Sequence, residues 1–233
     1  TLPFKAVDSL VDGLSHHLAG LRREKVEALL PTNIRALAKI FPVLLRVEAI
    51  AAFPKQDVPD PQELRRRAFA AFRELCQRLC THSPLILLVD NLQWGDADSA
   101  ALFGELFRAP DPPAVLLLGT IRSESVDGNP IVDVLREAGR RAADVTEIHE
   151  LEVEPLAYDD ARALAKRLLG AAATSELATA IADEAGGSPL FVEALVGYIQ
   201  AREIETSEGL DLDDVLYRTV AGLPEAARRL LGV

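Results

Sequence analysis

One acidic residue of this chain directly follows a long apolar run: the sequence LILLVD places Asp90 after Leu85–Val89. An unbroken apolar run of this length predicts a strand buried on both faces, as in a parallel sheet covered by helices. Ligands of such sheets bind at the carboxyl ends of the strands. A carboxylate at that point can hold the Mg²⁺ of a nucleotide, directly or through water. We therefore predict that Asp90 binds a metal ion and takes part in catalysis at a strand end.

A second candidate follows another apolar run, VLLLGT at 115–120, which leads into Ile121 and Arg122. If the two strands are neighbours, Arg122 can contact a terminal phosphate near Asp90 and sense its presence. The alternative is an arginine that extends into solvent from a strand end. Arg122 therefore points to a site only in combination with Asp90.

A third candidate is the sequence GGSP at 186–189. Glycine there ends one helix and proline begins the next. Either this is ordinary helix punctuation, or it forms a rigid corner against which a planar ligand packs. In the second case Gly187 and Pro189 make the contact.

Apolar spacing predicts the elements that position these residues. We expect helices at 6–21, within 24–52, from Pro61 towards the first strand, from 97 to about 108, at 158–169, 174–185, 189–203 and 211–222, and from Pro224 onward. Asp60 has the residue type and place of a helix N-cap. Strands are expected at 85–90, 115–120 and 145–153. Alternation of strands and helices predicts an α/β fold with a parallel sheet, whereas the sequence after Tyr158 is helical only.

Composition excludes several classes of protein. The formal net charge of −11 over 233 residues argues against a broad nucleic-acid surface, since phosphate binding needs clustered cations. The cluster Arg65–Arg67 is the main exception, and we interpret it as the solvated face of a helix. Cys76 and Cys80 lack the further ligands of a zinc site. No apolar segment approaches the roughly 18 residues of a membrane span, and the first residues do not resemble a signal peptide, so we expect a cytoplasmic protein without membrane contact.

Four phrases of the sequence together resemble one family: LILLVDNLQWGDADS, LLLGTIRSE, EAGGSPLFVEAL and LPEAARRLL. They are similar to the AAA-type ATPase region of the large bacterial STAND regulators, which are signal-transduction NTPases often fused to serine/threonine protein kinase or transcription-factor modules. The first phrase is the Walker B pattern of P-loop NTPases. The phrases containing LQW and GGSPLFVE are the most specific, and the resemblance covers nearly the whole chain.

The resemblance implies a function as well as a fold. It implies a partial P-loop NTPase core of the ASCE type at 1–155, an all-helical lid at 156–221 and the beginning of a winged-helix domain at 222–233. It implies ATP or ADP with Mg²⁺ as cofactors, with Mg²⁺ on Asp90, phosphate sensing on Arg122, and adenine packing on Gly187 and Pro189. Trp94 is expected to pack beneath the site. Kinase or DNA-binding output domains would be partners outside this chain.

One departure from the family pattern lies beside Asp90. The family usually has a second acid there, which polarises the attacking water, whereas this chain has Asn91. An amide can hydrogen-bond a water molecule but cannot accept its proton at neutral pH. We therefore expect hydrolysis to be weak or very slow, with the nucleotide acting as a switch.

The second departure is larger, because the sequence contains no G-x-x-x-x-G-K-[ST] motif and none of its 14 glycines is followed by lysine. That motif supplies the backbone cradle and the lysine for the β- and γ-phosphates. The sequence also contains no methionine, even at position 1. We interpret the chain as an internal piece of a longer protein whose P-loop lies upstream. Alone, it should bind ATP poorly and expose apolar sheet surface.

Two alternatives remain open from the sequence. In the first, the chain belongs to a degenerate relative that serves as a scaffold or protein-interaction module, which Asn91 favours. It could instead be an unrelated α/β enzyme that uses Asp90. The second alternative requires another catalytic cluster, and neither a G-x-S-x-G motif nor a kinase signature is present.

Overall fold

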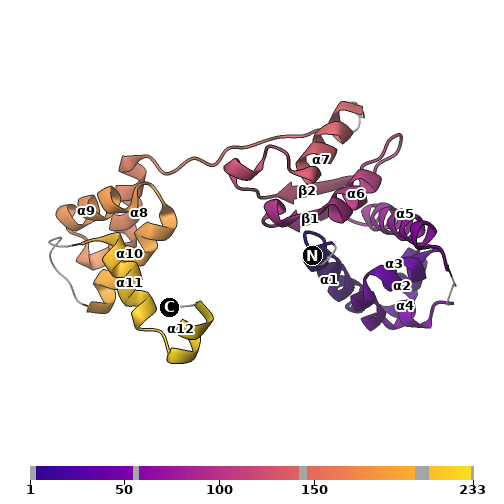
Figure 1. Ribbon diagram of the computed structural model, residues 1–233, viewed down its shortest axis with the longest axis horizontal. Coiled ribbons are helices and arrows are strands. Elements are labelled where there is room, and N and C mark those ends of the chain that lie inside the picture. The colour runs from indigo at the N-terminus through magenta and orange to yellow at the C-terminus, as the bar shows by residue number, and fades with distance from the viewer. Residues whose placement is uncertain (1–3, 55–57, 142–145, 203–209, 232–233) are drawn as a thin grey trace. The chain divides into compact units, whose positions relative to one another are not determined.

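The computed structural model describes residues 4–54, 58–141, 146–202 and 210–231. The chain divides into two units, Thr1–Glu150 and Leu151–Val233 (Figure 1). Each unit has its own hydrophobic core. Helices dominate both units, and a small parallel sheet lies in the first. By its general fold class the chain is therefore an α/β protein.

The first unit is built mainly from helices. Their bounds are α1 (Asp8–Ala19), α2 (Arg23–Leu29), α3 (Ile34–Ile40), α4 (Glu48–Ala52), α5 (Pro61–Cys80), α6 (Ala97–Leu106) and α7 (Pro130–Arg141), with 3-10 turns η1 (Pro42–Arg46), η2 (Leu92–Trp94) and η3 (Ser123–Ser125). Helix α3 packs against α5, and α6 packs against both α5 and α7. Phe72 and Phe103 are fully buried where these helices meet the core. The predicted helices at 6–21, 61 onward and 97–108 are confirmed.

The sheet consists of β1 (Leu85–Val89) and β2 (Val115–Gly119), which pair in parallel from Leu85 opposite Val115 to Val89 opposite Gly119. Leu87 and Val89 face the core and are at most 4% exposed. The opposite face carries apolar side chains that are 46–63% exposed, namely Ile86, Leu88, Leu116 and Leu118. The prediction of strands buried on both faces is therefore wrong for the described chain, because no described element covers this second face. The expectation of exposed apolar sheet surface is confirmed.

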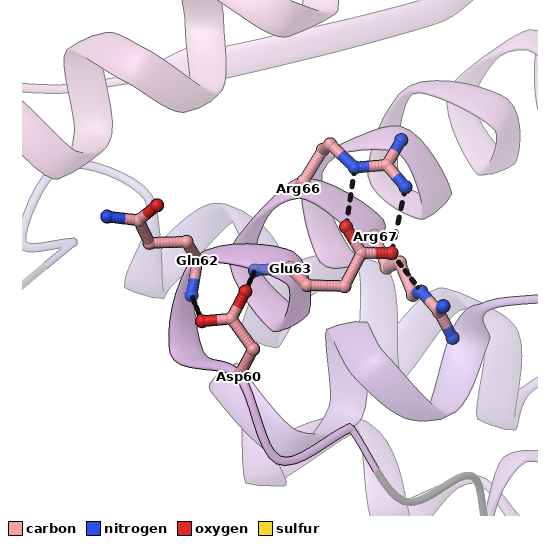
Figure 2. A network of polar contacts seen from close by, with 5 residues as sticks. All are labelled: Asp60, Gln62, Glu63, Arg66 and Arg67. Atoms are coloured by element: carbon pink, nitrogen blue, oxygen red, sulfur yellow. Dashed lines mark hydrogen bonds and ion pairs between the residues drawn. The ribbon is translucent and has the colours of Figure 1, made fainter.

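Helix α5 begins as the sequence predicts. The Asp60 carboxylate accepts hydrogen bonds from the backbone N–H groups of Gln62 and Glu63, each at 3.2 Å (Figure 2). These bonds satisfy two donors that have no partner within the helix. The Glu63 carboxylate binds Arg66 and Arg67 one turn further on, at 2.7 and 2.6 Å. These guanidinium groups lower the pKa of Glu63 to about 2 by hydrogen bonding to its charged form.

Two features of the first unit differ from the sequence prediction. Helix α7 was not predicted, although Asn129 and Pro130 form a recognisable start signal. The predicted third strand is wrong, because residues 146–153 form no strand, and residue 145 lies outside the described residues. Side chains attach this segment to α7 instead: Arg136 forms two hydrogen bonds of 2.7 and 2.8 Å with Glu150.

The second unit is wholly helical in its described part. It contains α8 (Tyr158–Leu169), the 3-10 turn η4 (Gly170–Ala172), α9 (Ser175–Ala185), α10 (Pro189–Arg202), α11 (Leu212–Ala221) and α12 (Glu225–Leu231). Helix α8 packs against α9 and α10 through small side chains, and Ala161 and Ala165 are fully buried. The predicted helices of this region are confirmed to within a few residues, apart from residue 203, which is not described. Among the residues that the structure describes, no helix has both the length and the apolar character of a membrane span.

Candidate functional site

The two strands end side by side and bring Asp90 next to Thr120. Val89 pairs with Gly119, so the next residue of each strand is Asp90 and Thr120. The ladder continues past the strands, because the Thr120 N–H donates to the Val89 carbonyl at 3.1 Å and the Leu92 N–H donates to the Thr120 carbonyl at 2.8 Å. At this exposed edge the Thr120 hydroxyl donates a hydrogen bond to Asp90 Oδ1.

Asn91 forms the turn that follows Asp90. Its backbone is left-handed, with φ 63° and ψ 55°, a conformation that Asn adopts more readily than most residues. The Asn91 N–H donates to Thr120 Oγ1 at 2.9 Å, and its Nδ2 donates to Asp90 Oδ2 at 2.8 Å. Its Oδ1 accepts a hydrogen bond from Gln93 Nε2 at 2.8 Å. The structure therefore joins Asp90 and Asn91 in one polar cluster with Thr120 and Gln93.

A buried asparagine supports this turn from the side. Asn129, only 6% exposed, donates through Nδ2 to the Leu92 carbonyl at 3.1 Å. Its Oδ1 accepts from the N–H groups of Ile131 and Val132 at 3.0 and 3.2 Å, at the start of α7. Leu92 itself is buried and packs against the backbone of Gly119. The turn after β1 is thus fixed to β2 and to α7.

Sequence reasoning missed three of these residues: Thr120, Gln93 and Asn129. Thr120 could have been found from the sequence. It directly follows the apolar run 115–119, just as Asp90 directly follows the apolar run 85–89. Gln93 and Asn129 have no such signal, since their partners depend on how the turn folds.

Two residues predicted to belong to the site, Arg122 and Trp94, are not part of the polar cluster around Asp90. Arg122 is exposed at the start of η3, and its nearest ion pair is with Glu124 at 3.9 Å. No interaction joins it to Asp90 in the described structure. Trp94 is 65% exposed, so the prediction that it packs beneath the site is wrong. The turn that carries it buries Leu92 instead.

Gly187 and Pro189 belong to the second unit. Gly186 and Gly187 end α9 in left-handed conformations, with φ 55° and 80°, and α10 begins at Pro189. The Leu156 N–H donates to the Gly187 carbonyl at 2.8 Å, and a Cβ at position 187 would lie 2.7 Å from the Leu156 carbonyl oxygen. This corner therefore binds the chain's own segment just before α8.

The donor groups at Asp90 fit a magnesium ion. Mg²⁺ prefers oxygen ligands and is usually held by one or two carboxylates, with water and phosphate oxygens filling the other positions. Asp90 offers one exposed carboxylate, with the Thr120 hydroxyl beside it. The described residues contain no group of three or more histidine, cysteine, aspartate or glutamate side chains able to hold a metal. The site is therefore suited to a cation that arrives with a phosphorylated ligand.

A hollow in the first unit lies between α7 and residues 146–150, lined by Arg136, Gly139, Arg140, Thr146, Ile148 and Glu150. Its arginines suggest an anion site. However, Arg136 is bound to Glu150, and Arg140 is bound to Glu137 at 2.6 Å. Because both charges are paired, the hollow lacks the free cations that a phosphate needs.

Comparisons of the chain with protein-family models, with curated proteins and with solved structures gave no significant match.

Proposed function

We propose that this chain is the nucleotide-binding region of a multidomain signalling regulator that resembles the STAND ATPases, with ATP or ADP and Mg²⁺ acting as a switch. The single observation that carries the proposal is the exposed Asp90 carboxylate at the carboxyl end of β1, beside Thr120 at the same end of β2. Parallel α/β sheets bind their ligands at this edge.

The proposal gives each site residue a role. Asp90 would hold Mg²⁺, which supplies charge neutralisation at the phosphates. Arg122 is exposed and would exchange its 3.9 Å ion pair with Glu124 for a terminal phosphate. The resemblance also implies adenine packing on Gly187 and Pro189 of the second unit. The finer fold assignment, a partial P-loop NTPase core with a helical lid and the start of a winged helix, belongs to the same proposal.

Nucleotide affinity should be low for these 233 residues alone. The sequence has no G-x-x-x-x-G-K-[ST] motif, so tight binding would require a phosphate cradle from outside it. We expect ATP to bind more weakly than micromolar in calorimetry. A micromolar dissociation constant for this chain would contradict the expectation.

Hydrolysis should also be slow, because Asn91 cannot accept a proton and both ends of its amide are engaged. In a preparation that binds ATP, we expect turnover well below the enzyme median of about 10 s⁻¹. Rapid turnover that Asn91→Asp leaves unchanged would refute the switch interpretation.

The test of the proposed function is the Mg²⁺ dependence of binding to a fluorescent ATP analogue. We expect Mg²⁺ to strengthen binding about tenfold, equivalent to about 1.4 kcal/mol, and Asp90→Asn to abolish that gain. Asp183→Asn, at an exposed aspartate of α9, is the matched control and should retain it. Equal Mg²⁺ dependence in the wild type and Asp90→Asn would refute the proposal.

A scaffold or protein-interaction module is the second candidate. The observation that favours it is the exposed apolar face of the sheet, formed by Ile86, Leu88, Leu116 and Leu118. Exposed apolar surface of this kind marks interaction sites in many proteins. A chain that binds no nucleotide and associates through this face would support this candidate over the first.

A further inference from the structure

The Asp90 carboxylate is held at both of its oxygens by neighbouring side chains. Oδ1 accepts from the Thr120 hydroxyl, and Oδ2 accepts from Asn91 Nδ2. Each carboxylate oxygen can accept about two hydrogen bonds or metal contacts. Both oxygens therefore remain able to face a cation or its water while these two donors fix the orientation of the group.

The Thr120 hydroxyl has a defined direction. It accepts a hydrogen bond from the Asn91 N–H, which uses one of its lone pairs. A hydroxyl has one hydrogen to donate, and that hydrogen goes to Asp90. The Thr120 backbone is itself fixed on both sides by the ladder bonds to Val89 and Leu92. The position of the Thr120 hydroxyl is therefore fixed by the backbone hydrogen bonds of the sheet.

The Asn91 amide has a defined direction as well. Its Oδ1 accepts from Gln93, so its Nδ2 is left to face Asp90. The opposite orientation would bring the Asn91 amide oxygen against a carboxylate oxygen, and a carboxylate can only accept hydrogen bonds. Asp90 thus sets the orientation of the Asn91 amide, and Gln93 donates to the Asn91 oxygen on the other side.

We infer that Thr120 is a positioning residue for a divalent cation at Asp90, and that Asn91 is the second clamp on the same carboxylate rather than a residue that activates water. The inference rests on the proposed function, since it assumes that Asp90 binds the cation. It assigns a role to Thr120, which acts through the carboxylate without contacting the metal. Partners that orient a metal ligand typically change metal affinity by 10- to 100-fold when they are removed.

The test uses Mn²⁺ alone as the probe, with free Mn²⁺ measured by electron paramagnetic resonance during titration of the 233-residue chain. Asp90→Asn should abolish the specific binding. Thr120→Val, which keeps the shape of the side chain and removes the hydroxyl, should weaken it by about tenfold or more. Thr120→Ser, which keeps the hydroxyl, should remain within about threefold of the wild type.

The possible failures can be distinguished. If Asp90→Asn binds Mn²⁺ as the wild type does, or the wild type binds none, Asp90 does not hold the bare cation and the inference is overturned. The proposed function is decided separately, by the Mg²⁺ dependence of ATP-analogue binding. If Asp90→Asn loses binding while Thr120→Val retains it, the cation site stands and the positioning role is overturned. If Thr120→Ser weakens binding as much as Thr120→Val does, the hydroxyl is not the cause, and the inference is equally overturned.

Discussion

At the scale of single residues, two of the turns with left-handed backbone bring the chain against another segment. Asn91 is left-handed at the end of β1, and Gly187 is left-handed at the end of α9. Each turn brings a backbone group against another segment: the Asn91 N–H meets Thr120, and the Gly187 carbonyl meets Leu156. The residue type at each position is therefore set by conformation and close approach together.

Gly187 and its neighbour Gly186 provide a matched pair of substitutions. Gly186→Ala adds a Cβ into open space and incurs only the left-handed conformation, which costs about 1 to 2 kcal/mol. Gly187→Ala incurs that cost and also places a Cβ 2.7 Å from the Leu156 carbonyl oxygen. We expect the larger loss of unfolding free energy for Gly187→Ala, measured by chemical denaturation of the second unit's helices. Equal losses would show that the Leu156 contact does not constrain this corner.

At the scale of elements, two of the helices that begin with a capping side chain differ in the surroundings of that cap. Asp60 caps α5 at an exposed position, whereas Asn129 caps α7 from a buried one. Asn129 also donates to the Leu92 carbonyl, and so it joins α7 to the turn beside Asp90. The buried cap therefore contributes to the site as well as to its helix.

The reciprocal substitutions at these caps should have unequal effects. Asn129→Asp keeps an acceptor for the helix N–H groups but loses the donor to Leu92 and sets a carboxylate against a buried carbonyl. We expect a loss of about 1 to 3 kcal/mol in unfolding free energy. Asp60→Asn keeps the acceptor at an exposed site and should change stability by less than about 0.5 kcal/mol. Thermal and denaturant unfolding measure both, and a harmless Asn129→Asp would contradict the assigned role.

The first turn of α5 should make stability depend on pH. Arg66 and Arg67 lower the pKa of Glu63 to about 2, well below the ordinary value of 4.5. A carboxyl group whose pKa is lowered by folding stabilises the folded state above its unfolded pKa. This contribution is lost as the pH falls from about 4.5 towards 2. We therefore expect the wild type to lose stability more steeply over this range than Glu63→Gln.

Unfolding midpoints measured at several pH values check this expectation. Glu24→Gln, at an exposed glutamate of α2, is the control and should follow the wild type. Parallel pH profiles for the wild type and Glu63→Gln would show that the ion pairs drawn in Figure 2 make no difference between the folded and unfolded states.

At the scale of the whole molecule, the chain exposes apolar sheet surface in its first unit. Ile86 lies opposite Leu116, and Leu88 lies opposite Leu118, so the exposed side chains form two cross-strand pairs. We expect the wild type to associate with increasing concentration and to bind an apolar dye. The double substitution Ile86→Thr with Leu116→Thr should reduce both effects, because threonine suits a strand and is more polar.

Sedimentation and dye fluorescence measure this association. Leu106→Thr is the contrasting variant, since Leu106 is fully buried and its replacement should unfold the unit instead. A wild type that stays monomeric and binds no dye at high concentration would show that the exposed face of the sheet does not mediate association.

Local sequence patterns predicted most of the elements and part of the site. The strand that leads to Asp90, the Asp60 cap and the helices from 158 onward depend on neighbouring residues, so short-range patterns were sufficient. The strand at 145–153 failed because alternation of apolar residues gives no information about a pairing partner. Thr120 and Asn129 were missed for a related reason: their roles depend on the parallel register and on the fold of the turn.

The most direct test of the account is where a paramagnetic cation binds on the chain. In a nuclear magnetic resonance titration with Mn²⁺, we expect the backbone amide signals of residues 89–92 and 119–121 to broaden first, because Asp90 and Thr120 lie together at the strand ends. Asp90→Asn should abolish this selective broadening. Broadening that begins elsewhere on this acidic chain, or that persists unchanged in Asp90→Asn, would contradict a cation site at Asp90.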